Sequence, residues 1–211
     1  MSIYLDSANP DEVRKAMALG FIAGITTNPI LIAHEGKPVY DLIVELLEVC
    51  SGTVFYQLTS HSLEEMRKEA ELFHAIAPDR LALKIPCTLT GLSLVAGLSS
   101  HMNCAVTAIF TPAQAFLASE AGARYVIPYV NRTTRLLGDG ILLVSEIAQI
   151  CRTVGRGTRV LAASLKTVDE VVETLLNGAQ HVTVPWNILQ ALAEHPLSYE
   201  AIAEFDAAAG S

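Results

Sequence analysis

The sequence predicts a (β/α)8 TIM barrel, an α/β fold, with an extra helix at its C-terminal end. Strand-like and helix-like segments alternate eight times along the chain, and no linker or low-complexity stretch interrupts the series. The 211 residues are near the lower size limit for such a barrel, and 51% of them are hydrophobic, which is enough to fill one core. A doubly wound open sheet is the alternative fold, but it seldom contains so many equal units. We therefore predict a single barrel domain over residues 1–211.

The first half of the chain is expected to supply four units, with strands at residues 3–6, 24–29, 54–58 and 81–86. Asn9 and Pro10 are residue types typical of a helix N-cap and first helical position, and Gly20 follows the expected end of this helix. Ser60 or Ser62 is expected to begin the helix after the third strand, because glutamates follow in its first turn. The other helices of this half are expected at residues 39–49 and 89–99.

The second half is expected to supply four more units, with strands at residues 105–109, 125–130, 160–164 and 181–184. Pro128 lies inside one of these strands and cannot donate a ladder hydrogen bond, so it predicts a bulge or a missing bond there. Pro112 and Pro185 are expected at the starts of two helices, the second of which is expected to end at about Glu194. The remaining helices are expected at residues 141–154 and 167–177, and the last one at residues 199–208.

The net charge and the absence of several motifs argue against whole classes of function. A formal net charge of −8 argues against a nucleic-acid-binding surface, which would be basic. Apolar runs stay short of the roughly 20 residues of a membrane helix, and no signal-peptide pattern is found, so we expect a cytoplasmic protein. The histidines lack metal-ligand spacing and no nucleotide-binding glycine loop occurs, so we expect no metal and no cofactor. The widely spaced cysteines are expected to be reduced thiols: Cys50, Cys87, Cys104 and Cys151.

A lysine inside an apolar strand is the centre of the predicted site. Lys84 lies between Leu83 and Ile85, and burial of an ammonium there is costly unless the group is paired or loses its proton. A fall of about three units from its usual pKa of roughly 10.4 would leave a neutral amine that can form a Schiff base with a carbonyl substrate. The alternative is a lysine that reaches the strand end or pairs with a buried carboxylate. The residues at the ends of the remaining strands favour the interpretation of Lys84 as a nucleophile.

Polar residues occur at the carboxyl ends of most of the predicted strands. Alternation with period two places Asp6 on the same face as Tyr4, and it places Ser164 above an inward-facing Ala162. Because barrel strands end at one rim, where barrel enzymes have their active sites, these side chains should meet there. The alternative for a single position is a side chain that caps the next helix. The predicted rim residues are Asp6, Thr26, Asn28, Gln57, Lys84, Thr107, Tyr129 and Ser164.

The chemistry of four of these rim residues suggests their roles. Asp6 is the only carboxylate of the set, and we expect it to assist proton transfer or to hold a substrate hydroxyl. We expect Gln57, Thr107 and Tyr129 to bind a water that moves protons during C–C bond cleavage.

Two cations follow the sixth and seventh predicted strands. Arg132 and Lys166 lie near Ser164 in the predicted fold, and in an acidic protein they indicate a site for a substrate phosphate. The alternative for both is a solvated loop charge. Barrel phosphate sites usually use the seventh and eighth strands, so this site is shifted by one unit.

Five segments resemble the small transaldolase family, and within it the fructose-6-phosphate aldolases. They occur in the family's order over nearly the whole chain: residues 4–6 (YLD), 24–29 (GITTNP), 84–86 (KIP), 129–132 (YVNR) and 161–166 (LAASLK). The resemblance implies a class I aldolase barrel without a metal, with Lys84 as the Schiff-base lysine and Asp6 as a catalytic acid/base. It implies that Asn28 and Ser164 contact the donor, and that Arg132, Ser164 and Lys166 bind the acceptor's phosphate. It also implies a homo-oligomer, a pentamer or a decamer.

Two positions distinguish the transaldolases of this family from its aldolases. The transaldolases have a glutamate where Gln57 stands and a phenylalanine where Tyr129 stands, so this sequence is similar to the aldolases that release free dihydroxyacetone. A phenol at Tyr129 adds a donor that can hold water against the dihydroxyacetone enamine, and protonation of the enamine frees the product. Ile127 and Ala105 differ from the aldolases, which often have a small and a larger residue at these positions. We therefore expect a reshaped donor pocket.

Three functions are compatible with the sequence. The first is aldol cleavage or formation of fructose 6-phosphate, or of a similar ketose phosphate, from a dihydroxyacetone-type donor and an aldehyde phosphate. The second is transfer of a dihydroxyacetone unit between sugar phosphates. The third is a barrel that binds sugar phosphates without catalysis, against which Lys84, Asp6 and Tyr129 argue. In each case the expected partners are small sugar phosphates and hydroxyketones, and neither nucleic acid nor a membrane.

Overall fold

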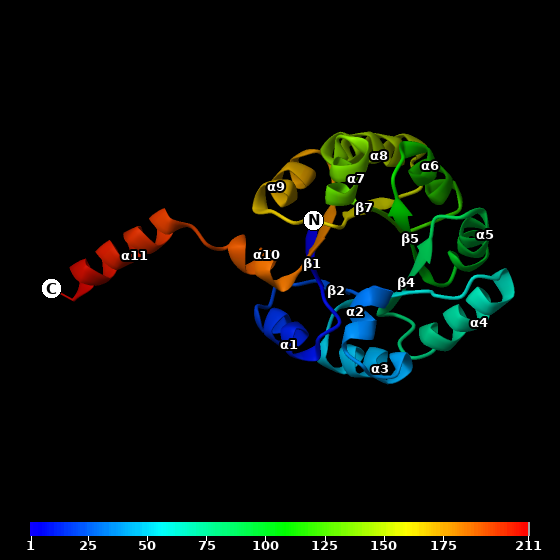
Figure 1. The fold of residues 1–211 in the computed structure, drawn as a ribbon, viewed down its shortest axis with the longest axis horizontal. Helices are drawn as coiled ribbons and strands as arrows, with labels where there is room; N and C mark the ends of the chain where they lie inside the picture. The colour runs from blue at the N-terminus through cyan, green and yellow to red at the C-terminus, as the bar shows by residue number, and fades with distance from the viewer. Residues whose placement is uncertain (211) are drawn as a thin grey trace.

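Eight parallel strands close into a barrel in this computed structural model, which describes residues 1–210. The order of the strands in the sheet follows their order in the chain, and β1 pairs with β8 to close the sheet. Figure 1 shows the helices around this barrel, with α11 extending away from it. The predicted (β/α)8 barrel with an extra C-terminal helix is therefore confirmed. No helix within residues 1–210 is long and apolar enough to cross a membrane.

The strands are β1 (Ser2–Asp6), β2 (Gly24–Thr26), β3 (Thr53–Gln57), β4 (Leu81–Pro86), β5 (Asn103–Ile109), β6 (Tyr125–Pro128), β7 (Arg159–Ala162) and β8 (His181–Val184). The helices are α1 (Pro10–Ala18), α2 (Pro29–His34), α3 (Val39–Val49), α4 (Leu63–His74), α5 (Leu89–Leu98), α6 (Pro112–Glu120), α7 (Val130–Leu137), α8 (Gly140–Val154), α9 (Val168–Leu176), α10 (Trp186–Ala191) and α11 (Pro196–Ala209). Local chemistry fixes several helix starts. Asn9 caps α1, and Ser62 forms a capping box with Glu65 at the start of α4.

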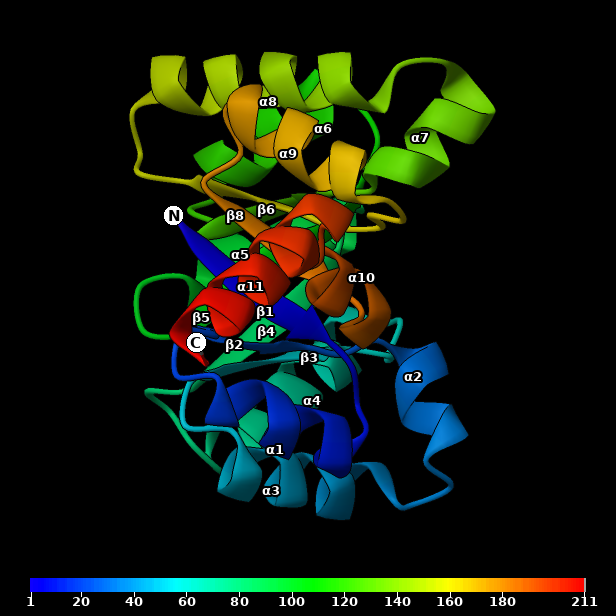
Figure 2. The ribbon, with the colours of Figure 1, turned by 90° about the vertical axis from the view of Figure 1, so that its left-hand side faces the viewer.

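Two short helices lie where longer strands were predicted. The predicted strand 24–29 ends at Thr26, because the side chain of Asn28 caps α2 and Pro29 takes its first position. The predicted strand 125–130 ends at Pro128, and α7 begins two residues later. Both corrections concern one end of the barrel, where α2, α7 and α10 gather (Figure 2). These helices therefore border the carboxyl ends of the strands.

The irregularity predicted at Pro128 is present, but the extra residue lies on the neighbouring strand. The pairing of β5 with β6 passes from Thr107 opposite Ile127 to Ile109 opposite Pro128. Ala108 is therefore the bulged residue, and its φ of 59° is in the left-handed region that alanine rarely adopts.

The hydrophobic core has two parts, one between sheet and helices and a smaller one inside the barrel. The interior contains an aromatic cluster in which the ring of Phe55 makes edge contacts with the rings of Tyr4 and Tyr125. The remaining interior residues are Ala82, Ala105, Ile127, Leu161 and Ala163. These side chains fill the barrel, so the polar residues that follow them on the strands lie nearer its mouth.

The inward-facing residues of the seventh strand differ from the prediction. Leu161 and Ala163 belong to the barrel interior, whereas Ala162 packs in the outer part of the core. The expectation that Ala162 faces inward beneath Ser164 is therefore wrong. Strand β7 ends at Ala162, and Ser164 has a φ of 60°, so simple alternation does not extend to this residue.

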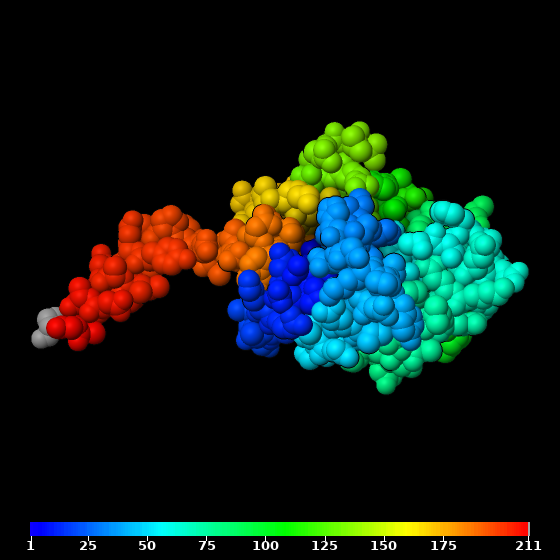
Figure 3. Space-filling view, turned by 60° about the horizontal axis from the view of Figure 1, so that its bottom comes forward, coloured from blue at the N-terminus to red at the C-terminus, as the bar shows by residue number. Residues whose placement is uncertain are grey.

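Helix α11 stands clear of the barrel, and none of its residues is buried. Figure 3 shows it as an arm that leaves the body of the molecule after α10. It begins at Pro196, three residues before the predicted start, and α10 ends at Ala191, before the predicted Glu194.

Candidate active site

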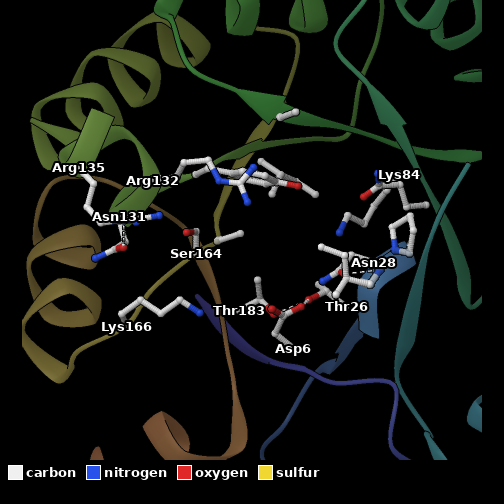
Figure 4. Close-up of a pocket in the computed structure, with 17 residues that line it drawn as sticks. Asp6, Thr26, Asn28, Lys84, Asn131, Arg132, Arg135, Ser164, Lys166 and Thr183 are labelled. Atoms are coloured by element: carbon white, nitrogen blue, oxygen red, sulfur yellow. Dashed lines mark hydrogen bonds between the residues drawn. The ribbon is translucent and has the colours of Figure 1, made fainter. Parts of the chain in front are cut away.

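A cavity of about 490 Å³ opens at the carboxyl ends of the strands. It brings together nine of the ten predicted site residues: Asp6, Thr26, Asn28, Gln57, Lys84, Tyr129, Arg132, Ser164 and Lys166 (Figure 4). Thr107 does not line the cavity directly; it contacts Tyr129 instead. The predicted common rim is thus present, while the chemical roles of its residues remain predictions.

Lys84 is buried inside the barrel, with 4% of its surface exposed. Its Nζ donates a hydrogen bond of 2.7 Å to the main-chain oxygen of Thr27. Burial lowers the pKa of Lys84 to about 8, although the nearby Asp6 carboxylate acts in the opposite direction. None of the ion pairs found within residues 1–210 includes Lys84. The side chain is therefore almost wholly buried at the cavity wall, and no carboxylate within residues 1–210 forms an ion pair with it.

Asp6 is held by a short chain of hydroxyl groups. The Oγ1 of Thr26 donates to Oδ1 of Asp6 at 2.8 Å, and it lies 2.6 Å from the Oγ1 of Thr183. Because the hydrogen of Thr26 is used on the carboxylate, Thr183 must donate to Thr26. The sequence prediction missed Thr183. Alternation from His181, whose ring packs on Tyr4 inside the barrel, would have placed Thr183 on the inner face.

Tyr129 is fixed on three sides. Its ring lies edge-on to Phe110, with 5.7 Å between the ring centroids, and the Cζ of Arg132 lies 5.1 Å from the centre of the ring. Its hydroxyl lies 3.2 Å from the Oγ1 of Thr107. Thr107 thus orients the phenol instead of facing the cavity, while the phenol itself is at the cavity wall.

Gln57 lines the same cavity, and its side chain contains a buried acceptor without a partner among residues 1–210. Its Oε1 is buried and makes no hydrogen bond to any residue within 1–210, although Gln57 lines the cavity. A buried acceptor without a partner is unfavourable by about 1–3 kcal/mol, so this oxygen is suited to receive a hydrogen bond from a bound molecule. Asn28 lines the cavity, and its Oδ1 also caps α2.

Cationic side chains gather on the side of the cavity that is away from Lys84 (Figure 4). Arg132 and Lys166 were predicted there, and Arg135 joins them. Arg135 was missed because helix α7, which carries it one turn after Arg132, was not predicted. The left-handed residue Ser164 lines the cavity as well, so it reaches the predicted place by an unpredicted backbone turn.

Within residues 1–210, no group of three or more histidine, cysteine, aspartate or glutamate side chains is arranged to hold a metal ion. The four cysteines are free thiols, as predicted. The groups available at the cavity are therefore one amine, one carboxylate, neutral hydrogen-bonding groups and guanidinium or ammonium cations.

The fold and the cavity define a barrel protein with a buried lysine amine on one side of its mouth and cationic side chains on the other. The family model described as Transaldolase/Fructose-6-phosphate aldolase matches residues 3–210. The chain belongs to this family, and it is an enzyme of the transaldolase/aldolase kind.

Relatives cover nearly the whole chain. A "Probable transaldolase" of Oceanobacillus iheyensis is 39% identical over 206 residues, which are 97% of this chain and 96% of the relative. A "Probable transaldolase" of Thermoplasma acidophilum is 39% identical over 209 residues, with 97% and 93% covered. Among solved structures, inosine 5′-monophosphate dehydrogenase from Legionella pneumophila has a TM-score of 0.62 and 14% identity. That match covers 89% of this chain and 58% of the other, and it concerns the fold alone.

Proposed function

We propose that this protein is a class I aldolase that cleaves and forms fructose 6-phosphate, or a similar ketose phosphate, through a Schiff base on Lys84. The observation that carries the proposal is the burial of Lys84 at a cavity wall, with a pKa lowered to about 8 and no ion pair to a carboxylate within residues 1–210. Such an amine is nucleophilic near neutral pH, whereas an exposed lysine is almost wholly protonated. The proposed products are a dihydroxyacetone-type donor and an aldehyde phosphate.

In the cleavage direction, the neutral amine of Lys84 attacks the ketone carbon C2, and loss of water gives the protonated Schiff base. The hydroxyl on C4 then gives up its proton to a water, the C3–C4 bond breaks, and its electron pair forms an enamine as the aldehyde phosphate leaves. A proton returns to the enamine carbon. Hydrolysis then releases dihydroxyacetone and restores Lys84.

The other cavity residues suit the proton transfers. The free Oε1 of Gln57 can accept from the catalytic water, and the phenol of Tyr129, oriented by Thr107, can hold the same water. Asp6, oriented by Thr26, can move the proton when water is lost from the first adduct. The cations opposite Lys84 suit a phosphate at the far end of the substrate.

Trapping of the covalent intermediate tests this proposal. Treatment with dihydroxyacetone and borohydride should leave one stable reduced adduct, and peptide mapping by mass spectrometry should locate it on Lys84. Lys84→Met should form no adduct and show no turnover. An adduct at another lysine, or turnover that survives in Lys84→Met, would overturn the proposal.

Transfer of the dihydroxyacetone unit is the second candidate, because the relatives at 39% identity carry the name probable transaldolase. The phenol of Tyr129 supports release instead, since it can deliver water to the enamine and so free the donor. Incubation of the purified protein with fructose 6-phosphate and no acceptor separates the two: release of dihydroxyacetone supports the lyase. Product formed only after addition of erythrose 4-phosphate supports the transferase.

We further propose that the chain forms a homo-oligomer, a pentamer or a decamer, in which α11 docks on a second copy. No residue of α11 is buried. Its exposed large apolar residues are Leu197, Tyr199, Ile202 and Phe205. A helix of 14 residues has little stability in water without such packing. Light scattering should give an oligomer for the full chain and smaller species for Ile202→Asp/Phe205→Asp. A monomeric full chain contradicts this.

A further inference from the structure

The anion side of the cavity has more cationic side chains than one phosphate requires. Arg132, Arg135 and Lys166 all line the cavity, and none of the ion pairs found within residues 1–210 includes them. Asp6 is the one carboxylate among the lining residues. A phosphate monoester carries a charge of roughly −1.5 to −2 at neutral pH, so two cations are enough for it. The third cation needs an explanation.

The two arginines lie at different distances from Lys84 (Figure 4). They are three residues apart on α7, which places them on one face of the helix and about 4.5 Å apart along its axis. The guanidinium of Arg132 lies over the ring of Tyr129. Arg135 lies farther from Lys84, beside Asn131 (Figure 4).

A chain of hydrogen bonds holds Arg135 in this position. Its Nε donates to Oδ1 of Asn131 at 3.2 Å, and Nδ2 of Asn131 donates to Oε1 of Glu170 at 2.6 Å. The other carboxylate oxygen of Glu170 accepts from the main-chain nitrogen of Lys166 at 2.6 Å. Glu170 thus links the segments that carry Arg135 and Lys166. Because Nε is the one side-chain nitrogen of Arg135 with a hydrogen bond within residues 1–210, both terminal nitrogens remain available for a planar, two-point contact with an oxyanion.

We infer that Arg135 determines acceptor length, and that it binds the phosphate of aldose phosphates longer than three carbons. This inference rests on the proposed aldol function and adds to it the class of acceptor. In a three-carbon acceptor the phosphate is held by Arg132 and Lys166. Each added carbon moves the phosphate away from the Schiff base, and after one or two carbons it lies within reach of Arg135. Arg135 therefore allows binding of acceptors whose phosphate lies about one helical turn farther from the Schiff base than the phosphate held by Arg132.

The test compares Arg135→Ala with wild type in the synthesis direction, with dihydroxyacetone and four acceptors at low ionic strength. The acceptors are glyceraldehyde, glyceraldehyde 3-phosphate, erythrose 4-phosphate and ribose 5-phosphate. We expect KM for ribose 5-phosphate to rise about tenfold, with an intermediate rise for erythrose 4-phosphate. KM for glyceraldehyde 3-phosphate should rise less than twofold, and for uncharged glyceraldehyde it should not change. The kcat values should be retained, because Arg135 is remote from the reacting carbon.

Three further variants sharpen the result. Arg135→Lys keeps the charge and should recover part of the affinity for the five-carbon acceptor. Asn131→Ala keeps the guanidinium but removes its support, and it should raise the same KM about threefold. Arg14→Ala is the matched control, because Arg14 is an exposed arginine of α1 whose ion-pair partners are Asp11 and Glu45. It should change none of the four KM values.

Several outcomes overturn the inference. An equal rise of KM for all phosphorylated acceptors would mean that Arg135 binds the phosphate at the same position as Arg132 and does not discriminate between acceptors by chain length. A rise that includes uncharged glyceraldehyde would mean that Arg135 supports the fold of the site, and no rise at all would mean a solvated charge. Failure of the proposed function is recognised separately, by the absence of a Lys84 adduct and of turnover in the wild type.

Discussion

The side-chain nitrogen of Lys84 reaches past β3 to the carbonyl oxygen of Thr27, 2.7 Å away, just after the end of β2. Thr27 is itself fixed, because its main-chain nitrogen and its hydroxyl both donate to the carbonyl oxygen of Phe55 on β3. A neutral carbonyl oxygen holds the amine without stabilising its positive charge as strongly as a carboxylate would. Lys84 can therefore lose its proton and keep its orientation.

The rate of Schiff-base formation should follow the protonation of Lys84. Burial lowers the pKa of this amine to about 8, and the neutral form is the nucleophile. Between pH 6 and 7 the rate should rise close to tenfold, and it should level off above pH 8. Rapid mixing with dihydroxyacetone, followed by borohydride quenching at fixed intervals, measures this rate. A profile that still rises steeply above pH 9.5 would contradict the lowered pKa.

Replacement of Lys84 by methionine should stabilise the fold at neutral pH while it abolishes activity. The folded-state pKa lies near 8 and the unfolded value is about 10.5, so the unfolded chain binds the proton more tightly. The contribution of Lys84 to wild-type stability is therefore most unfavourable below pH 8, and this penalty is lost as the pH increases toward 10.5. The penalty at pH 7 is of order 3 kcal/mol, less about 1 kcal/mol for the hydrogen bond to Thr27 that the variant loses.

Urea unfolding at pH 7 and at pH 9.5 tests this expectation. The stability advantage of Lys84→Met should be present at pH 7 and smaller at pH 9.5, because the wild type gains stability between these values. Lys15→Met, at an exposed position of α1, is the control and should change the free energy of unfolding by less than about 0.5 kcal/mol. A variant less stable than wild type at pH 7 would count against a costly buried charge.

Removal of the Tyr129 hydroxyl should shift the reaction from release toward transfer. Tyr129→Phe keeps the ring contacts with Phe110 and Arg132 but loses the hydroxyl that we propose holds water near the enamine. We expect the ratio of dihydroxyacetone released to dihydroxyacetone transferred to erythrose 4-phosphate to fall several-fold. Product analysis in the presence of erythrose 4-phosphate measures the ratio. Tyr40→Phe, at an exposed site, should leave it unchanged. An unchanged ratio in Tyr129→Phe would contradict the role that we propose for the phenol.

Thr183 should act as a positioning residue for Asp6 through Thr26. Thr183→Val keeps the shape but removes the donor to Thr26, and the carboxylate then has a less well oriented partner. We expect kcat to fall about tenfold with KM nearly unchanged, and Thr183→Ser to restore most of the loss. Thr158→Val is the matched control, because Thr158 is a buried threonine whose hydroxyl donates to the main-chain oxygen of Ala123. It should lower stability without a change in kcat. Equal kcat losses in both variants would indicate a general packing effect.

Local patterns in the sequence were enough to predict the architecture and most of the candidate site. Alternation with period two identified interior residues on β1, β3 and β4, where a strand runs regularly to its end. The position of Lys84 in an apolar strand predicted its burial, and burial lowers the pKa of an amine whatever the surrounding fold. The resemblance added the roles, and the structure adds the geometry in which those roles can be tested.

The departures lie where the chain leaves regular structure. The left-handed backbone at Ser164, the bulge at Ala108 and the short helix α7 decide which polar groups reach the mouth of the barrel. None of these has a periodic signal, because each depends on how a strand end fits its neighbours in the closed sheet.

The sequence by itself determined the number of units, the buried amine and the class of side chains at one rim. The closed barrel decided that Thr27 supplies the partner of Lys84, that Thr183 supports Thr26, and that Arg135 joins the cations. These contacts join residues far apart in the chain, and their distances are set by strand pairing and barrel closure.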